Sequence, residues 1–132
     1  MVLLNDKPIT WNCSKQSVVA TSTFESEYMA LAEGVKAGLY INNLLGEFVE
    51  ILEPCILNVD NHAAKSFAES EGCNNRTKHV DIRLHFVRDY VAKGKFIINY
   101  IKSCENIADL LTKILPAETQ SKLTGELLRK VW

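Results

Sequence analysis

Apolar residues recur at close to helical spacing in the segment TSTFESEYMALAEGVKAGLYINNLLGEFVE, which covers residues 21–50. A spacing of three to four residues places such side chains on one face of a helix. Ser22 stands at the start of this segment and Glu25 follows it by three residues, which is the pattern of a capping box. The segment therefore predicts a long helix from about Thr23 to about Glu50.

Short apolar runs elsewhere predict strands. Near the N-terminus, turn-forming residues (Asn5, Asp6 and Pro8) separate two such runs, which predicts strand, turn and strand. The run CILNVD, residues 55–60, is apolar with little alternation, as is typical of a strand covered on both faces in a parallel sheet. The later run KFIINYI also predicts a strand.

The remaining segments predict helices. NHAAKSFAES predicts a short helix, and VDIRLHFVRDYVAKG predicts an amphipathic helix that ends at Gly94. SCENIADLLTKIL predicts a helix capped by Ser103, and a last helix, AETQSKLTGELLRKVW, follows Pro116. The element order β-β-α-β-α-α-β-α predicts an α/β fold, with a mixed sheet flanked by helices.

Length and composition fit this picture. The chain has 132 residues, 47% of them hydrophobic, which predicts a single domain over residues 1–132 with its own core. Residues from about 116 to 132 form a C-terminal helical extension of that domain. The sequence contains no apolar run of 18 residues, so a soluble intracellular protein that does not enter a membrane is expected.

The charges are distributed unevenly. The net charge is −1, but residues 1–60 hold three Lys or Arg and eight Asp or Glu, whereas residues 61–132 hold twelve and eight. The second part contains a basic cluster of Arg76, Lys78, Arg83, Arg88, Lys93 and Lys95. Such a cluster can contact phosphates, although charge alone favours a solvated helix face.

Three carboxylates suggest a metal site. Asp60 ends a predicted strand, Glu27 lies early in the long helix, and Asp109 lies early in the helix after the last strand. Ligand sites of open α/β sheets lie beyond the carboxyl ends of the parallel strands, and magnesium prefers oxygen ligands. Each residue also has a simpler interpretation: Glu27 complements a helix N-terminus, Asp60 caps the next helix, and Asp109 is an exposed helical residue.

Four segments in order carry a resemblance to a known family. They are PITWNCSKQSVVATSTFESEYMALAEGVK, NVDNHAAKSFA, RTKHVDIRLHFVRD and ENIADLLTK. Together they resemble the ribonuclease H domain of copia-type retrotransposon Pol polyproteins, from about Leu3 to about Lys122. The resemblance implies a five-stranded mixed sheet flanked by helices. It also implies hydrolysis of the RNA strand of RNA–DNA hybrids with two Mg²⁺ ions during reverse transcription.

The resemblance assigns roles by position. The family's second, third and fourth acids fall on Glu27, Asp60 and Asp109, which become the catalytic and magnesium-binding residues. The RTKHVDIRLHF segment resembles the part of the family that faces the hybrid. Its candidate contacts are Arg76, Lys78, His79 and Arg83. The implied partners are the RNA–DNA hybrid and the reverse transcriptase and integrase parts of the parent polyprotein. The implied location is the cytoplasm, in the virus-like particle of the parent element, with the nucleus as the alternative.

One departure from the family pattern changes the expected activity. The family's first catalytic aspartate lies on a first strand, in an upstream segment of the type DADWAGD, which residues 1–132 do not contain. We therefore expect a chain truncated at the N-terminus, lacking the first strand, that binds Mg²⁺ weakly and is inactive by itself. The alternative is a catalytically dead module on the same fold that binds nucleic acid or another protein.

Overall fold

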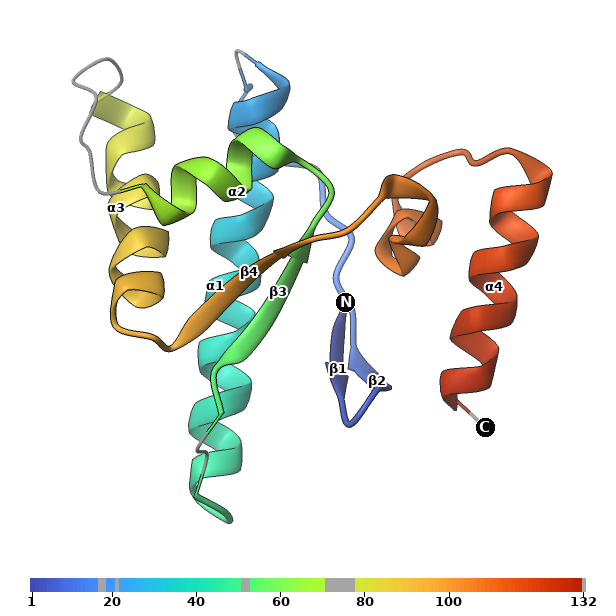
Figure 1. Ribbon diagram of the computed structural model, residues 1–132, viewed down its shortest axis with the longest axis horizontal. Coiled ribbons are helices and arrows are strands. Elements are labelled where there is room, and N and C mark those ends of the chain that lie inside the picture. Colours follow the sequence, from blue (N-terminus) through green and yellow to red (C-terminus); the bar gives the residue numbers. More distant parts are fainter. Residues whose placement is uncertain (17–18, 21, 51–52, 71–77, 132) are drawn as a thin grey trace. The chain divides into compact units, whose positions relative to one another are not determined.

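The computed structural model describes the chain except for residues 17–18, 21, 51–52, 71–77 and 132 (Figure 1). The contacts divide it into two compact units. Unit 1 consists of Met1–Val18 and Ile101–Trp132, and unit 2 consists of Val19–Tyr100. The interpretation of residues 1–132 as one domain stays a prediction.

The described residues of unit 2 form two parallel strands and three helices. Its elements are α1 (Thr23–Gly46), β3 (Cys55–Val59), α2 (His62–Glu69), α3 (Lys78–Ala92) and β4 (Phe96–Tyr100). Strand β3 pairs with β4 from Cys55 opposite Phe96 to Val59 opposite Tyr100. Both strands therefore end at the same edge, and α2 begins beside that edge (Figure 1).

The ends of two helices follow the sequence signals. The Ser22 hydroxyl accepts a hydrogen bond from the Glu25 backbone N–H at 3.1 Å, which confirms the predicted cap of α1. Gly94 has a φ of +66° and lies just after α3, which confirms the predicted C-terminal signal. Helix α1 stops at Gly46 rather than near Glu50, because the chain turns there and the Phe48 N–H bonds to the Leu45 carbonyl.

The core of unit 2 lies on one face of the strand pair. It contains Tyr28, Leu31, Ala32, Val35, Ala64, Ala68, Val87, Phe96 and Ile98. Gly38 lets α1 approach the strands closely, because a Cβ at this position would lie 2.7 Å from Cε1 of Phe96. On the other face, Ile56 is 61% exposed. Among the described residues of unit 2, the helices cover β3 on one face only, so the predicted coverage of this strand on both faces is not found there.

Unit 1 contains an antiparallel hairpin of β1 (Val2–Leu4) and β2 (Lys7–Thr10) and helix α4 (Ala117–Val131). Asn5 and Asp6 join the strands with φ angles of 48° and 62°, and such positive angles are required by the tight turns of two-residue hairpins. The predicted turn is confirmed at Asn5 and Asp6, whereas Pro8, which the sequence also predicts to belong to it, lies within β2. Lys130 of α4 forms an ion pair with Asp6 at 3.2 Å.

The segment 103–115 does not form the single helix that the sequence predicts. It forms two short 3₁₀ helices, η1 (Ser103–Glu105) and η2 (Ile107–Leu111), separated by Asn106. The Asn106 side chain accepts a hydrogen bond from the Ala108 backbone N–H, and this local bond competes with a continuous helix. The predicted cap, Ser103, lies within η1 instead.

The predicted fold class is confirmed at the level of a mixed α/β structure with small sheets and flanking helices. In the described part of the chain the strands form two separate pairs, β1 with β2 and β3 with β4. None of the helices described is both long and apolar enough to cross a membrane.

Candidate active site

Asp60 directly follows β3 at the carboxyl edge of the parallel pair. The next residue, Asn61, has extended backbone angles, and its Oδ1 accepts a hydrogen bond from the Ala64 N–H at 3.0 Å. Asn61 is therefore the N-cap of α2, and the interpretation of Asp60 as that cap is wrong. Capping does not account for a carboxylate at this strand end.

The assignment of the α2 cap to Asn61 rather than Asp60 gives a prediction about stability. The substitution Asn61→Ala removes the cap, so we expect it to lower the free energy of unfolding by about 1 kcal/mol. Asp60→Asn, which leaves that cap in place, is expected to have a smaller effect. Urea denaturation followed by circular dichroism measures both, and an equal loss for the two variants would contradict this assignment.

Polar and aromatic side chains lie around the same edge. The Asn99 amide donates to Oδ1 of Asn58 at 2.9 Å across the strand pair. The His62 ring stacks on the Tyr100 ring, with centroids 3.6 Å apart and planes 19° apart. The sequence pattern does not predict this stack. The signal for it lies in the register, because Tyr100 is paired with Val59, next to Asp60.

Glu27 lies in the second turn of α1 and is partly buried, and its neighbour Tyr28 turns into the core. Burial raises the pKa of Tyr28 to about 12, and the nearby positive charge of Arg88 opposes this shift. The rings of Phe24 and Tyr28 pack on Phe67 of α2 at 5.3 and 5.6 Å. The start of α1 is thus packed against the helix that begins just after Asp60.

Asp109 lies in η2 of unit 1 and is only 4% exposed. The interpretation of it as an exposed helical residue is therefore wrong. Its Oδ1 accepts a hydrogen bond from the Asn106 amide at 3.1 Å, and its Oδ2 accepts one from Lys113 Nζ at 2.9 Å. A buried carboxylate with an ammonium and an amide as partners is compensated in charge and in hydrogen bonding.

The three acids have the chemistry of a magnesium site. Carboxylate oxygens are the hard ligands that Mg²⁺ prefers, so the donor set fits the ion. Glu27 and Asp60 belong to unit 2 and Asp109 to unit 1. In the described part of the chain no group of three His, Cys, Asp or Glu side chains is placed to hold a metal ion. The three-carboxylate site therefore stays a prediction.

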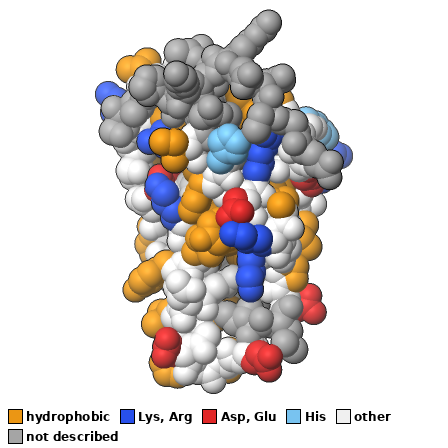
Figure 2. Space-filling model, turned by 90° about the vertical axis from the view of Figure 1, so that its left-hand side faces the viewer, with side chains coloured by type: hydrophobic (Ala, Val, Ile, Leu, Met, Phe, Trp, Pro, Cys, Tyr) orange, Lys and Arg blue, Asp and Glu red, His pale blue; other side chains and the backbone are white. Residues whose placement is uncertain are grey.

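The candidate nucleic-acid contacts lie on or beside α3. Arg76 lies outside the described residues, as do the side chains of Lys78 and His79 at the start of the helix. Arg83 is partly buried on α3. Among the coloured side chains of Figure 2, basic ones are interspersed with acidic and apolar ones.

One basic residue on α3 has a clear structural role. The Arg88 guanidinium lies 4.1 Å from the centre of the Phe67 ring, and its Nε donates to the Phe67 carbonyl at 3.0 Å. It also donates to the Ser70 hydroxyl. Arg88 therefore ties the end of α2 to α3, which is a packing role.

Sequence comparison shows the class of proteins to which the chain is related. The homologues of this chain are Pol polyproteins of retrotransposons. They include the retrovirus-related Pol polyprotein from transposon TNT 1-94 of Nicotiana tabacum, 32% identical over 108 residues, or 82% of this chain. The corresponding protein from transposon RE1 of Arabidopsis thaliana is 31% identical over 87% of the chain. The truncated transposon Ty1-A Gag-Pol polyprotein of Saccharomyces cerevisiae is 31% identical over 94%.

The homology covers a small segment of each relative. The chain spans 8% of the TNT 1-94 and RE1 polyproteins and 10% of the Ty1-A protein. No protein-family model matches the sequence. No solved structure matches it either. The chain is thus homologous to one segment of much longer retroelement polyproteins.

Proposed function

We propose that the chain derives from the ribonuclease H domain of a retrotransposon Pol polyprotein, whose activity is hydrolysis of the RNA strand of RNA–DNA hybrids. Homology to retrotransposon Pol polyproteins over most of the chain supports the retroelement origin. The ribonuclease H assignment rests on the four resembling segments and on the placement of their acids. The parent polyprotein, with its reverse transcriptase and integrase, is the proposed context.

The observation that carries the proposal is the position of Asp60. It directly follows a strand of a parallel pair, where ligand sites of α/β sheets lie, and Asn61 supplies the cap of the following helix. The Asp109 carboxylate adds support, because it is buried and held by a cationic partner rather than exposed. A buried, ion-paired carboxylate of a candidate site fits a functional role as well as a structural one.

The chain's own residues have distinct tasks in the proposed reaction. Glu27, Asp60 and Asp109 would hold two Mg²⁺ ions, which when bound supply the charge that activates water and stabilises the leaving oxygen. Asn106 orients Asp109 through its 3.1 Å hydrogen bond to Oδ1. The packing of Phe24 and Tyr28 on Phe67 fixes the start of α1, which carries Glu27, against α2.

The proposed partner is the RNA–DNA hybrid, contacted by Arg76, Lys78, His79 and Arg83. Hybrids are recognised by shape, phosphates and 2′-hydroxyl groups rather than by base edges, so these contacts carry no sequence preference. The parent element's virus-like particle in the cytoplasm is the proposed location, with the nucleus as the alternative.

This partner assignment gives a prediction about salt dependence. The double substitution Arg76→Ala and Lys78→Ala is expected to weaken hybrid binding equally for all sequences. It should also reduce the slope of log K against log salt by about 1 to 2, because up to two phosphate contacts are lost. Fluorescence anisotropy at several salt concentrations measures this slope. Lys36→Ala is the control, because Lys36 is exposed and pairs with Glu33 at 2.7 Å. An unchanged slope in the double variant would mean that Arg76 and Lys78 do not contact phosphates and lie on a solvated face.

A cleavage assay tests the proposed reaction. The protein assayed carries this chain preceded by the family's first strand and its aspartate, and the hybrid is labelled on either the RNA or the DNA strand. Magnesium-dependent cleavage of the RNA strand alone supports the proposal. Binding of the hybrid without any cleavage favours the alternative of a catalytically dead binding module.

A further inference from the structure

The carboxylate of Asp109 has two partners of different character. Asn106 is held in place, because its own Oδ1 accepts the Ala108 N–H at 3.2 Å while its amide donates to Asp109 Oδ1. Lys113 reaches Oδ2 at 2.9 Å through a long stem with several rotatable bonds. The Oδ1 atom of Asp109 thus accepts a hydrogen bond from a fixed amide, whereas Oδ2 pairs with an ammonium on a flexible side chain.

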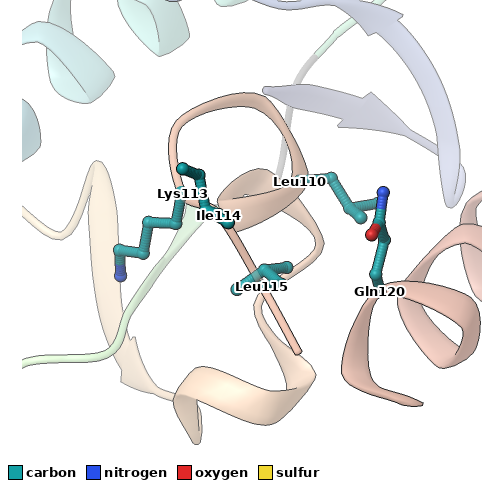
Figure 3. A pocket seen from close by; sticks show the side chains of 5 residues that line it. All are labelled: Leu110, Lys113, Ile114, Leu115 and Gln120. Atoms are coloured by element: carbon teal, nitrogen blue, oxygen red, sulfur yellow. The ribbon is translucent and has the colours of Figure 1, made fainter. Parts of the chain in front are cut away.

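Lys113 also has space into which it can move. Its side chain is 45% exposed, whereas that of Asp109 is 6% exposed. Lys113 borders a cavity of about 240 Å³, together with Leu110, Ile114, Leu115 and Gln120. Figure 3 shows its side chain extending away from Leu110 and Gln120, which lie on another side of the cavity. The Lys113 side chain is therefore not enclosed in a packed core.

We propose that Lys113 is the resident counter-ion of Asp109 and competes with the divalent cation for its Oδ2 atom. This inference rests on the proposed function, because it takes Asp109 to be a metal ligand. In the metal-free chain the ammonium balances the buried charge. A divalent ion on the same oxygen would lie close to the ammonium, and the two cations repel each other. Lys113 is therefore displaced when the ion binds, and its charge lowers the affinity for that ion.

The test measures cation binding by the complete 132-residue chain, with Mn²⁺ as the probe and electron paramagnetic resonance to count the free ion. Lys113→Met keeps the length of the side chain and removes its charge. We expect this variant to bind Mn²⁺ on the order of tenfold more tightly than the wild type. Lys113→Arg keeps the charge and is expected to bind as weakly as the wild type.

A matched control comes from α3, where Lys93 pairs with Asp89 at 2.6 Å with the same spacing of four residues, but both side chains are exposed. Lys93→Met changes the net charge equally and is expected to leave Mn²⁺ affinity unchanged. Adding Asp109→Asn to Lys113→Met is expected to abolish the gain. This double variant shows whether the gain arises at Asp109.

The outcomes separate this inference from the proposed function. A folded Lys113→Met variant whose Mn²⁺ affinity is equal to or lower than that of the wild type overturns the inference, as does the absence of Mn²⁺ binding in every variant. Affinity that depends on Asp60 and Asp109 but not on Lys113 leaves the proposed function standing without the inference. A gain that depends on Asp109, with no hybrid cleavage by the extended protein, supports the inference and contradicts the proposed function.

Discussion

Asp60→Asn is expected to lower cleavage of the RNA strand by a factor on the order of 10³ or more in the protein extended by the family's first strand. The amide keeps the shape of the side chain and removes the negative charge that would hold Mg²⁺ at the end of β3. Because Asn61 caps α2, the fold is expected to survive the substitution. Single-turnover cleavage of a labelled hybrid at saturating enzyme measures the loss.

The control for this experiment is Asp89→Asn. Asp89 is exposed on α3, where it pairs with Lys93, so the same chemical change is made outside the proposed metal site. We expect full activity in the control and unchanged hybrid binding in both variants. Cleavage at the wild-type rate by Asp60→Asn would falsify the assignment of Asp60 as a metal ligand.

Phe96→Ala is expected to destabilise unit 2 by about 3 to 5 kcal/mol. Phe96 begins β4 and is only 1% exposed, and its ring approaches Gly38 of α1 and packs edge-on against Tyr90 of α3. Its removal leaves a cavity where two helices meet the strand pair. A loss of this size is a large fraction of the 5 to 15 kcal/mol that is typical of whole domains, so urea denaturation shows it clearly.

The adjacent residue provides the comparison for Phe96. Ile97 points to the opposite face of β4 and is 49% exposed. We expect Ile97→Ala to cost less than Phe96→Ala by at least about 2 kcal/mol, since far less apolar surface leaves a packed environment. Similar losses for the two variants would mean that both faces of the strand are equally important for stability.

Local patterns of the sequence predicted the elements well. Turn-forming residues marked the hairpin at Asn5 and Asp6, the Ser22 signal marked the start of α1, and Gly94 marked the end of α3. In each case the signal acts over a few residues, through backbone angles or a single cap. Such local signals can be recognised in a sequence without knowledge of the rest of the fold.

The sequence does not show which of two adjacent residues takes a structural role that both could fill. Asp60 and Asn61 are both good capping residues, and only the backbone geometry shows that Asn61 is the cap. Similarly, Asn106 offers a side-chain acceptor that interrupts the helix expected over residues 103–115. The spacing of four residues between Asp109 and Lys113 was visible, but burial of that carboxylate depends on packing that no local pattern contains.

A shared site of Glu27, Asp60 and Asp109, which stays a proposal, is what residue spacing is least able to predict. These residues come from separate elements, and their distances depend on how those elements pack rather than on the residues beside them. The resemblance supplied the assignment, and the structure places Glu27 and Asp60 in unit 2 and Asp109 in unit 1. The cleavage and Mn²⁺ measurements therefore bear directly on the part of the site that sequence patterns leave open.

The division of the chain has a consequence for synthesis on the ribosome. Unit 2 is one continuous stretch, Val19–Tyr100, whereas unit 1 joins the first residues to the last thirty or so. Domains fold as they emerge from the ribosome, so unit 2 can assemble while the C-terminal segment is still being made. The β1–β2 hairpin can pair locally, but its packing with α4 requires the C-terminal segment, so we expect unit 1 to be completed after unit 2.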